Sequence, residues 1–141
     1  NWTPERGNDP MKRPIWTLIM AGLLLLCSAC AAKAGPLTLP AADDVTEVRL
    51  EYEGESVVRT GPGWIEMLLE DMAAAEPTRK ATVQDVPDKE DMASVHFVLE
   101  DGSEQTVFVY PEKNKWYIES PYEGVYETDQ LLWVMVTDLS E

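Results

Sequence analysis

The chain has 141 residues, of which 45% are hydrophobic, and it carries 26 Asp plus Glu against 11 Lys plus Arg, a formal net charge of −15 at pH 7. This length accommodates one domain with a packed core. The excess of negative charge repels nucleic acid and anionic lipid head groups, so nucleic-acid binding is excluded as a function.

Residues 1–10 precede an internal methionine, Met11, and are not typical of the start of a secreted protein. They place Glu5 and Asp9 where a signal peptide would be cationic. The codons of residues 5–7 can form a purine-rich run, three codons before Met11, of the kind that serves as a bacterial ribosome-binding site. We therefore interpret residues 1–10 as an untranslated leader that has been read in frame.

Residues 11–29 predict a secretory signal peptide. Lys12 and Arg13 provide the cationic start, and an uncharged apolar run of twelve residues follows at 15–26. That run is too short to span a bilayer, which takes about 20 apolar residues. The two residues before Cys30 are small, as a signal peptidase requires.

Cys30 lies where a bacterial lipoprotein carries its lipidated cysteine. The surrounding sequence resembles the lipobox, in which this cysteine receives a diacylglycerol thioether and its freed amine is acylated. Cys27 departs from the pattern, because the lipobox usually has Leu, Ile or Val at that position. We predict a lipid on Cys30 rather than on Cys27, since cleavage before Cys27 would place the bulky Leu26 at the scissile bond.

The predicted lipid places the protein on the extracytoplasmic face of the cell membrane. The alternative is ordinary secretion after cleavage at the A-x-A site of residues 32–34. A disulfide between the two cysteines would enclose almost no chain and would stabilise little. From Cys30 onward the chain has 8 Lys plus Arg and 24 Asp plus Glu, a formal charge of −16.

The lipidated cysteine and a flexible tether are predicted over residues 30–43. The residues after Cys30 are small, punctuated by proline and without a hydrophobic period. Thirteen extended residues would reach roughly 40 Å. The tether would therefore lift the folded domain, predicted over residues 44–141, clear of the lipid head groups.

Local patterns predict two strands and a helix at the start of the domain. Apolar Val48, Leu50 and Tyr52 alternate with charged residues, which indicates a strand with one wet face. Gly54 turns the chain into a short strand over residues 56–59. The spacing then becomes helical, and Pro77 is expected to end a helix whose apolar face contains Trp64, Ile65, Leu68, Leu69, Met72 and Ala75.

Four further strands and a second helix are predicted after Pro77. Asp101-Gly102 marks a hairpin between strands that start near Ser94 and end near Tyr110. The next strand, 115–119, is followed by a turn at 120–124 in which Gly124 is expected to take a positive φ. The last helix, 129–139, is predicted to be capped by Thr128 and to bury Leu131, Leu132, Met135 and Leu139.

The order β-β-α-β-β-β-β-α predicts an α+β domain. Its sheet should be mainly antiparallel, with about five to six strands and both helices on one face. The strand 115–119 should place Trp116 and Ile118 on one side of the sheet and Tyr117 and Glu119 on the other.

Two segments of the domain resemble a family of small uncharacterised domains that is common in lipoproteins of clostridia and other Firmicutes. One has the pattern Ser/Thr-Val-x-Asp-x-Pro and the other Tyr-x-Glu-x-Pro-Tyr-x-Gly-Ile/Val-Tyr. They fall on Thr82, Val83, Asp85 and Pro87, and on Tyr117, Glu119, Pro121, Tyr122, Gly124, Val125 and Tyr126. The resemblance covers nearly the whole domain and implies a domain of unknown function, sometimes joined to membrane sensors of the β-lactam-receptor kind.

No catalytic constellation is found in the sequence, and we predict neither an enzyme nor a cofactor. His96 is the single histidine, and strand alternation places it on the wet face with Ser94 and Val98. The acidic loop 85–91 could offer oxygens to calcium through Asp85, Asp88, Glu90 and Asp91, but it lacks the alternation and central glycine of an EF-hand. We therefore interpret it as a solvated loop and predict no metal site.

These patterns favour a binding, sensing or regulatory module at the bacterial envelope with an envelope protein as its partner. Trp133 lies roughly 160° from the apolar stripe of the last helix, at about 100° per residue, and Tyr122 occupies the tip of a proline turn. Exposed aromatic residues of this kind are enriched among interface hot spots. The candidate partner-binding residues are Tyr122, Trp133, Tyr117, Tyr126 and Glu119. A small hydrolase with an acidic pair, an enzyme inhibitor and a structural spacer are the alternatives.

Overall fold

The computed structural model describes residues 33–82 and 85–140. In chain order, the elements are η2 (Ala42–Asp44), β1 (Val45–Tyr52), β2 (Glu55–Arg59), α2 (Pro62–Ala73), β3 (Glu76–Pro77), β4 (Ala93–Leu99), β5 (Glu104–Glu112), β6 (Lys115–Ser120), β7 (Gly124–Thr128) and α3 (Gln130–Thr137). Within the described residues, seven strands form one sheet in the order β2-β1-β4-β5-β6-β7-β3, and every neighbouring pair is antiparallel.

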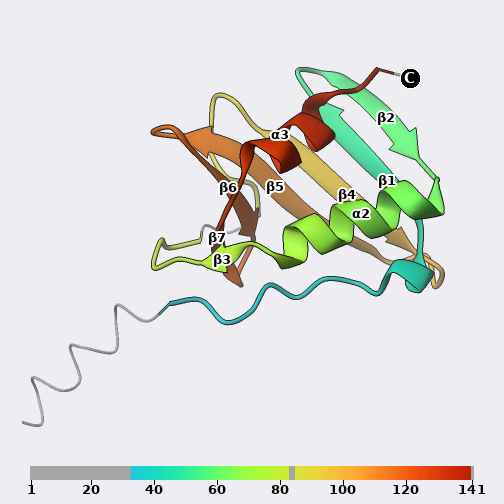
Figure 1. The fold of residues 1–141 in the computed structure, drawn as a ribbon, viewed down its shortest axis with the longest axis horizontal. Coiled ribbons are helices and arrows are strands. Elements are labelled where there is room, and N and C mark those ends of the chain that lie inside the picture. The colour runs from blue at the N-terminus through green and yellow to red at the C-terminus, as the bar shows by residue number, and fades with distance from the viewer. Residues whose placement is uncertain (1–32, 83–84, 141) are drawn as a thin grey trace, which may run out of the picture. The chain divides into compact units, whose positions relative to one another are not determined.

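Both helices lie on the same face of the sheet, where they cross in front of the strands (Figure 1). Between the helices and the sheet lies a core in which removal of apolar surface from water stabilises the fold. Its fully buried members include Val48, Leu50, Leu68, Met72, Val95, Phe97, Val107, Val109, Ile118, Tyr126, Leu132 and Val136. The predicted α+β class and the helices on one face are confirmed.

The sheet has one strand more than the predicted maximum of six, because a short strand lies at its edge. β3 has two residues and pairs with β7, with Pro77 opposite Tyr126. Proline is tolerated there because an edge strand can leave its missing N–H unpaired. The prediction that Pro77 ends the preceding helix is wrong, since α2 already ends at Ala73.

The last helix differs from the prediction in its cap and its buried face. Thr128 still belongs to β7, and the side chain of Asp129 caps the helix by accepting a hydrogen bond from the Leu132 backbone N–H at 3.0 Å. Leu132 is buried as predicted, Val136 is the second buried position, and Met135 and Leu139 are only partly buried. Leu131, predicted to be buried, is 61% exposed.

The turn between β6 and β7 takes its positive φ at Tyr122 (63°), so the expectation that Gly124 supplies it is wrong. Gly124 is required for a different reason. A Cβ atom at this position would lie 2.4 Å from the Cβ of Ala34, much closer than carbon atoms approach. The glycine therefore lets the N-terminal segment pack directly on β7.

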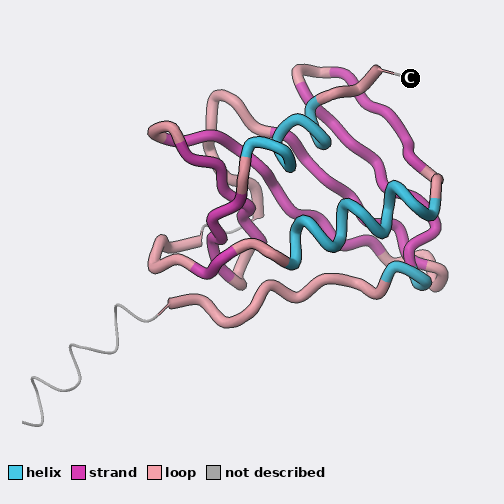
Figure 2. The backbone as a smooth tube through the Cα atoms, in the orientation of Figure 1, coloured by secondary structure: helices cyan, strands magenta, loops and turns pink. Residues whose placement is uncertain are grey.

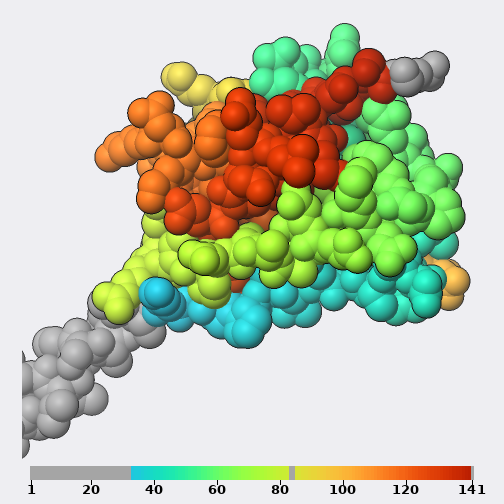
Figure 3. Space-filling view, in the orientation of Figure 1, coloured from blue at the N-terminus to red at the C-terminus, as the bar shows by residue number. Residues whose placement is uncertain are grey.

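Residues 33–43, predicted to be part of a flexible tether, are packed along the domain. Ala34, Leu37, Leu39 and Ala42 are partly buried against the core, and the segment runs alongside α2 in the space-filling view (Figure 3). The Tyr126 hydroxyl donates to the Gly35 carbonyl at 2.8 Å. The prediction failed because these four apolar residues of an irregular segment cover part of the core. The folded unit therefore includes residues 33–43, which lie before its predicted start at residue 44.

The backbone trace shows this segment as an extended loop that leads into η2 (Figure 2). Cys27, Cys30 and the predicted signal peptide lie outside the described residues. In the part of the chain that the structure describes, no helix combines the length and the apolar character needed to cross a membrane.

Candidate functional site

The two sequence motifs meet on the face of the sheet opposite the helices. The Thr82 hydroxyl lies 3.2 Å from Oε2 of Glu119, and the Tyr122 hydroxyl lies 3.3 Å from Oδ1 of Asp85. One partner of each pair comes from the loop between β3 and β4, and the other from β6 or the turn after it. The motifs therefore seat this loop on the sheet.

Glu119 is the centre of this contact and is only 2% exposed. Besides the Thr82 contact, its Oε1 accepts a hydrogen bond from the Tyr110 hydroxyl at 2.9 Å. Burial of Tyr110 and its bond to the Glu119 carboxylate raise the pKa of the Tyr110 hydroxyl. These bonds meet the requirement that a buried carboxylate be hydrogen-bonded.

Two lysines of the same loop cover the neighbouring tyrosines. The Lys80 ammonium lies 4.6 Å from the centre of the Tyr117 ring, and the Lys89 ammonium lies 4.8 Å from that of Tyr110. Both lysines also pair with Glu112, at 3.5 Å and 3.3 Å. Hydrogen bonding by Lys89 and the two positive charges lower the pKa of Glu112.

Three of the five predicted partner-binding residues are thus held inside the domain. Tyr117, Glu119 and Tyr126 are 7%, 2% and 0% exposed. Their bonds to the loop and to the N-terminal segment give them a structural role. The predicted alternation, with Tyr117 and Glu119 on the side of the sheet opposite Ile118, is confirmed, but nothing local indicated that a loop covers that side.

Trp133 is half-buried and packs edge-on against Tyr52 of β1, with ring centres 5.4 Å apart and planes at 82°. The Tyr52 hydroxyl donates to Asp91 at 2.8 Å. That hydrogen bond, followed by burial, raises the pKa of Tyr52. Trp133 therefore joins α3 to the β1–β2 hairpin, although part of its surface stays exposed as the sequence predicted.

Tyr122 is the predicted site residue that the structure leaves most open, at 70% exposure. It lines a shallow depression of about 460 Å³. The depression lies on the face of the sheet opposite the helices, in the part that we call the open face. The negative charge of Asp85, with some burial and their hydrogen bond, raises the pKa of the Tyr122 hydroxyl. The depression is lined by Glu51, Asp85, Val86, Ser94, His96, Thr106, Phe108, Pro121 and Tyr122.

His96 is one of the polar residues that line the depression beside Tyr122. Its Nδ1 lies 2.8 Å from the Thr106 hydroxyl, and its Nε2 lies 3.2 Å from Glu51. The predicted alternation is confirmed, because the neighbouring Val95 and Phe97 are fully buried on the other face. His96 stands out in the sequence as the single histidine, but nothing in the sequence indicates that Tyr122 lies beside the same depression.

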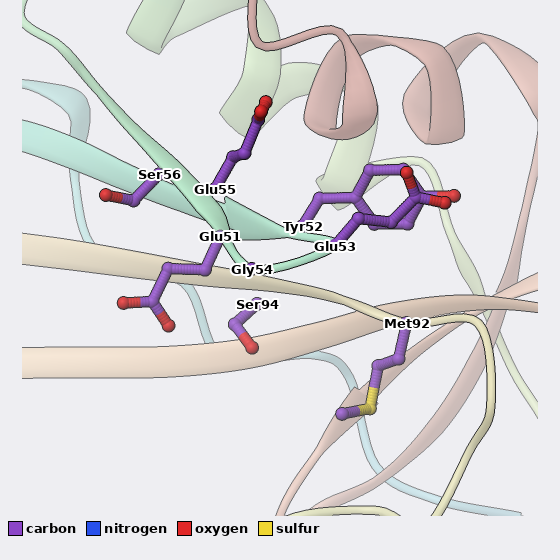
Figure 4. Close-up of a pocket in the computed structure, with 8 residues that line it drawn as sticks. All are labelled: Glu51, Tyr52, Glu53, Gly54, Glu55, Ser56, Met92 and Ser94. Atoms are coloured by element: carbon purple, nitrogen blue, oxygen red, sulfur yellow. The ribbon is translucent and has the colours of Figure 1, made fainter.

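A second depression, of about 350 Å³, lies at the turn of the β1–β2 hairpin and is lined by residues 51–56, Met92 and Ser94. In Figure 4, the carboxylates of Glu51, Glu53 and Glu55 point in different directions, so they do not converge on a common ligand. The carboxylates of the acidic loop 85–91 do not converge either, because Asp85 accepts a hydrogen bond from Tyr122 and Asp91 accepts one from Tyr52. Among residues 33–82 and 85–140, no group of three or more His, Cys, Asp or Glu side chains could hold a metal ion.

Comparison with known proteins finds one matching family model. This model, DUF5301, carries the description of a domain of unknown function (DUF5300), and it matches residues 33–127. The chain is also similar to a solved structure, the NMR structure of a protein from Ruminococcus gnavus, with 27% identity and a TM-score of 0.59. That similarity covers 70% of this chain and 99% of the other. No curated protein matches the chain.

The expected resemblance to a domain of unknown function is therefore confirmed. The match begins at residue 33, where the packed N-terminal segment also begins. The occurrence of this family in lipoproteins of Firmicutes stays a prediction.

Proposed function

The chain belongs to the DUF5301 family of domains of unknown function, and we propose that it is a lipid-anchored binding module on the extracytoplasmic face of a bacterial membrane. The observation that carries the binding role is the 70% exposed Tyr122 at the rim of the open-face depression. A tyrosine supplies a large contact area with little side-chain entropy to lose, which suits an interface anchor.

The depression favours a protein partner with a cationic side chain next to an apolar one. Glu51 and Asp85 line it, and the mature chain carries 24 acidic against 8 basic residues. Val86, which is 61% exposed, adds apolar surface beside Tyr122. Complementary charge steers such a partner, and the aromatic contact contributes affinity. We therefore propose an exposed segment of an envelope protein as the occupant, with binding rather than catalysis as the activity.

A photo-crosslinking amino acid at position 122 tests the binding role in cells that express the full chain. The matched control carries the same group at Val58, which is 48% exposed on the edge strand β2. We expect a discrete crosslinked protein from position 122 and none from position 58. The same product from both positions would contradict the proposed surface.

The captured protein then allows a quantitative test. Tyr122→Ala should weaken its binding by about 2 kcal/mol, or roughly thirtyfold, while thermal stability changes little. Unchanged affinity would show that Tyr122 is not part of the interface.

The anchor is tested by two cysteine substitutions in the native host. Cys30→Ser should abolish labelling by a lipid precursor and release the protein from the membrane fraction. Cys27→Ser is the matched control and should leave both unchanged, because Cys27 leaves with the signal peptide. Labelling that persists without Cys30 would refute the proposed anchor.

A further inference from the structure

We infer that the end of the domain formed by residues 33–35, Thr78 and Arg79 is held directly against the membrane. This inference rests on the proposed anchor at Cys30. It replaces the tethered arrangement, in which residues 30–43 would hold the domain well away from the lipid head groups.

Hydrogen bonds fix the position of the N-terminal segment on the domain. The Ala34 N–H donates to the Thr78 carbonyl at 3.1 Å, and the Gly35 carbonyl accepts from Tyr126. Further along, the Thr38 N–H donates to Glu123 and the Thr38 carbonyl accepts from Gln105, both at 2.6 Å. These residues are thus bonded to the loop after β3 and to the sheet.

The chain between the proposed lipid and the domain is short. Only three peptide units separate Cys30 from Lys33, and they span at most about 11 Å. A free segment from Cys30 to Asp44 would span up to about 50 Å. Because the domain starts at Lys33, a lipid on Cys30 keeps this end within about 11 Å of the anchored residue.

This end of the domain carries two cations. Lys33 and Arg79 are exposed, and neither forms an ion pair within the described residues. Glu123 also lies at this end, where its carboxylate accepts hydrogen bonds from the Thr38 N–H and from the Ser120 hydroxyl at 2.8 Å. Each cation near an anionic bilayer contributes about 1 kcal/mol of attraction.

The rest of the domain is strongly acidic and is repelled by anionic lipid. The exposed Glu76 of β3 opposes part of the attraction at Lys33 and Arg79. The short link to Cys30 and these two cations still favour an orientation in which this end, rather than the more acidic remainder of the domain, faces the membrane. In that orientation, β3 and β7 lie near the bilayer. β2 is at the opposite edge of the sheet, roughly 24 Å from β7 at about 4.8 Å per strand.

Paramagnetic relaxation on lipid vesicles tests this orientation. The mature chain from Cys30 has Cys30 as its single cysteine, so a maleimide phospholipid can be attached there chemically. The vesicles contain phosphatidylcholine, phosphatidylglycerol and a small fraction of lipid with a gadolinium chelate on its head group. We expect the amide signals of Ala34 and Arg79 to lose most of their intensity, while those of Val57 and Val58 keep theirs.

A charge-reversed pair of variants provides the control. Arg79→Glu should spread the signal loss toward β2, whereas Lys113→Glu, at the exposed β5–β6 turn, should leave the pattern unchanged. Equal signal loss at β2 and at Arg79 in the unsubstituted protein, or the same pattern in both variants, would overturn the inference. Because the lipid is attached chemically, these results do not depend on lipidation in the cell, which Cys30→Ser tests separately.

Discussion

The hydroxyl of Thr82 lies 3.2 Å from Oε2 of Glu119, a residue 37 positions later in the chain. Glu119→Ala should lower the free energy of unfolding by about 2 kcal/mol, because the buried Tyr110 hydroxyl would lose its acceptor. Thr82→Val removes one hydroxyl on the loop side and should cost about 1 kcal/mol. Urea unfolding measures both effects.

The same variants should loosen the loop between β3 and β4. Faster amide hydrogen exchange in residues 79–91 is expected for Glu119→Ala. Unchanged stability and exchange in that variant would show that Glu119 does not hold the loop.

Gly124→Ala should destabilise the protein by about 1–3 kcal/mol, as expected for overpacking. The new Cβ would collide with Ala34, which lies 2.4 Å from its position. Residues 33–40 should then become sensitive to limited proteolysis. Ala34→Gly in the same chain should restore most of the loss, and an equal loss with and without that second substitution would contradict the packing.

Asp71→Ala should stabilise the protein at pH 7 by about 1 kcal/mol. Oδ2 of Asp71 is buried and has no hydrogen-bond partner within the described residues, and burial together with the charge of Asp129 raises the pKa of Asp71. A raised carboxyl pKa means that the native state disfavours the charged form. The destabilisation is therefore complete above the raised pKa and disappears as the pH falls through it toward the ordinary value.

Urea unfolding at pH 7 and near pH 4 measures this dependence. Glu70→Ala is the matched control, because Glu70 is an exposed acid in the same helical turn. Glu70→Ala also removes a negative charge near the helix C-terminus, so it should give the same stabilisation from that cause. It removes no buried oxygen, so it should not give the additional stabilisation expected for Asp71→Ala. A benefit of Asp71→Ala that is equal at both pH values would contradict the argument.

Trp133→Ala should lower the free energy of unfolding by about 2 kcal/mol, because it removes the edge-on contact with Tyr52 and leaves a gap under α3. Leu131→Ala on the same helix should change stability by less than about 0.5 kcal/mol, since Leu131 is 61% exposed. Thermal unfolding distinguishes the two. Similar losses in both variants would mean that α3 is oriented differently.

Elements whose signals are local were predictable from the sequence. The alternation around Leu50 and around Phe97 fixes which face of each strand is buried, and Gly102 takes the positive φ of 84° that a tight hairpin needs. The placement of Tyr117 and Glu119 on one side of β6 follows from the same two-residue period.

Features that depend on distant residues were not predictable. β3 exists only because β7 pairs with its two residues. Glu119 is buried because the loop between β3 and β4 packs on the sheet over it. Residues 33–43 are held in place by hydrogen bonds to Thr78 and Tyr126. Tyr122, which hydrogen-bonds to the distant Asp85, takes the positive φ of its turn, and Gly124 instead lies against the distant Ala34.

The packing of residues 33–38 also constrains the order in which the fold can be completed. Gly35 and Thr38 bond to Tyr126 and Glu123, which come 91 and 85 residues later. The meander from β4 to β7 uses only hairpin contacts, so it can form from pairs that are local in the sequence. The first residues of the domain can pack only against β7, which is the last strand of the chain, so the N-terminal segment is the last part of the fold to close.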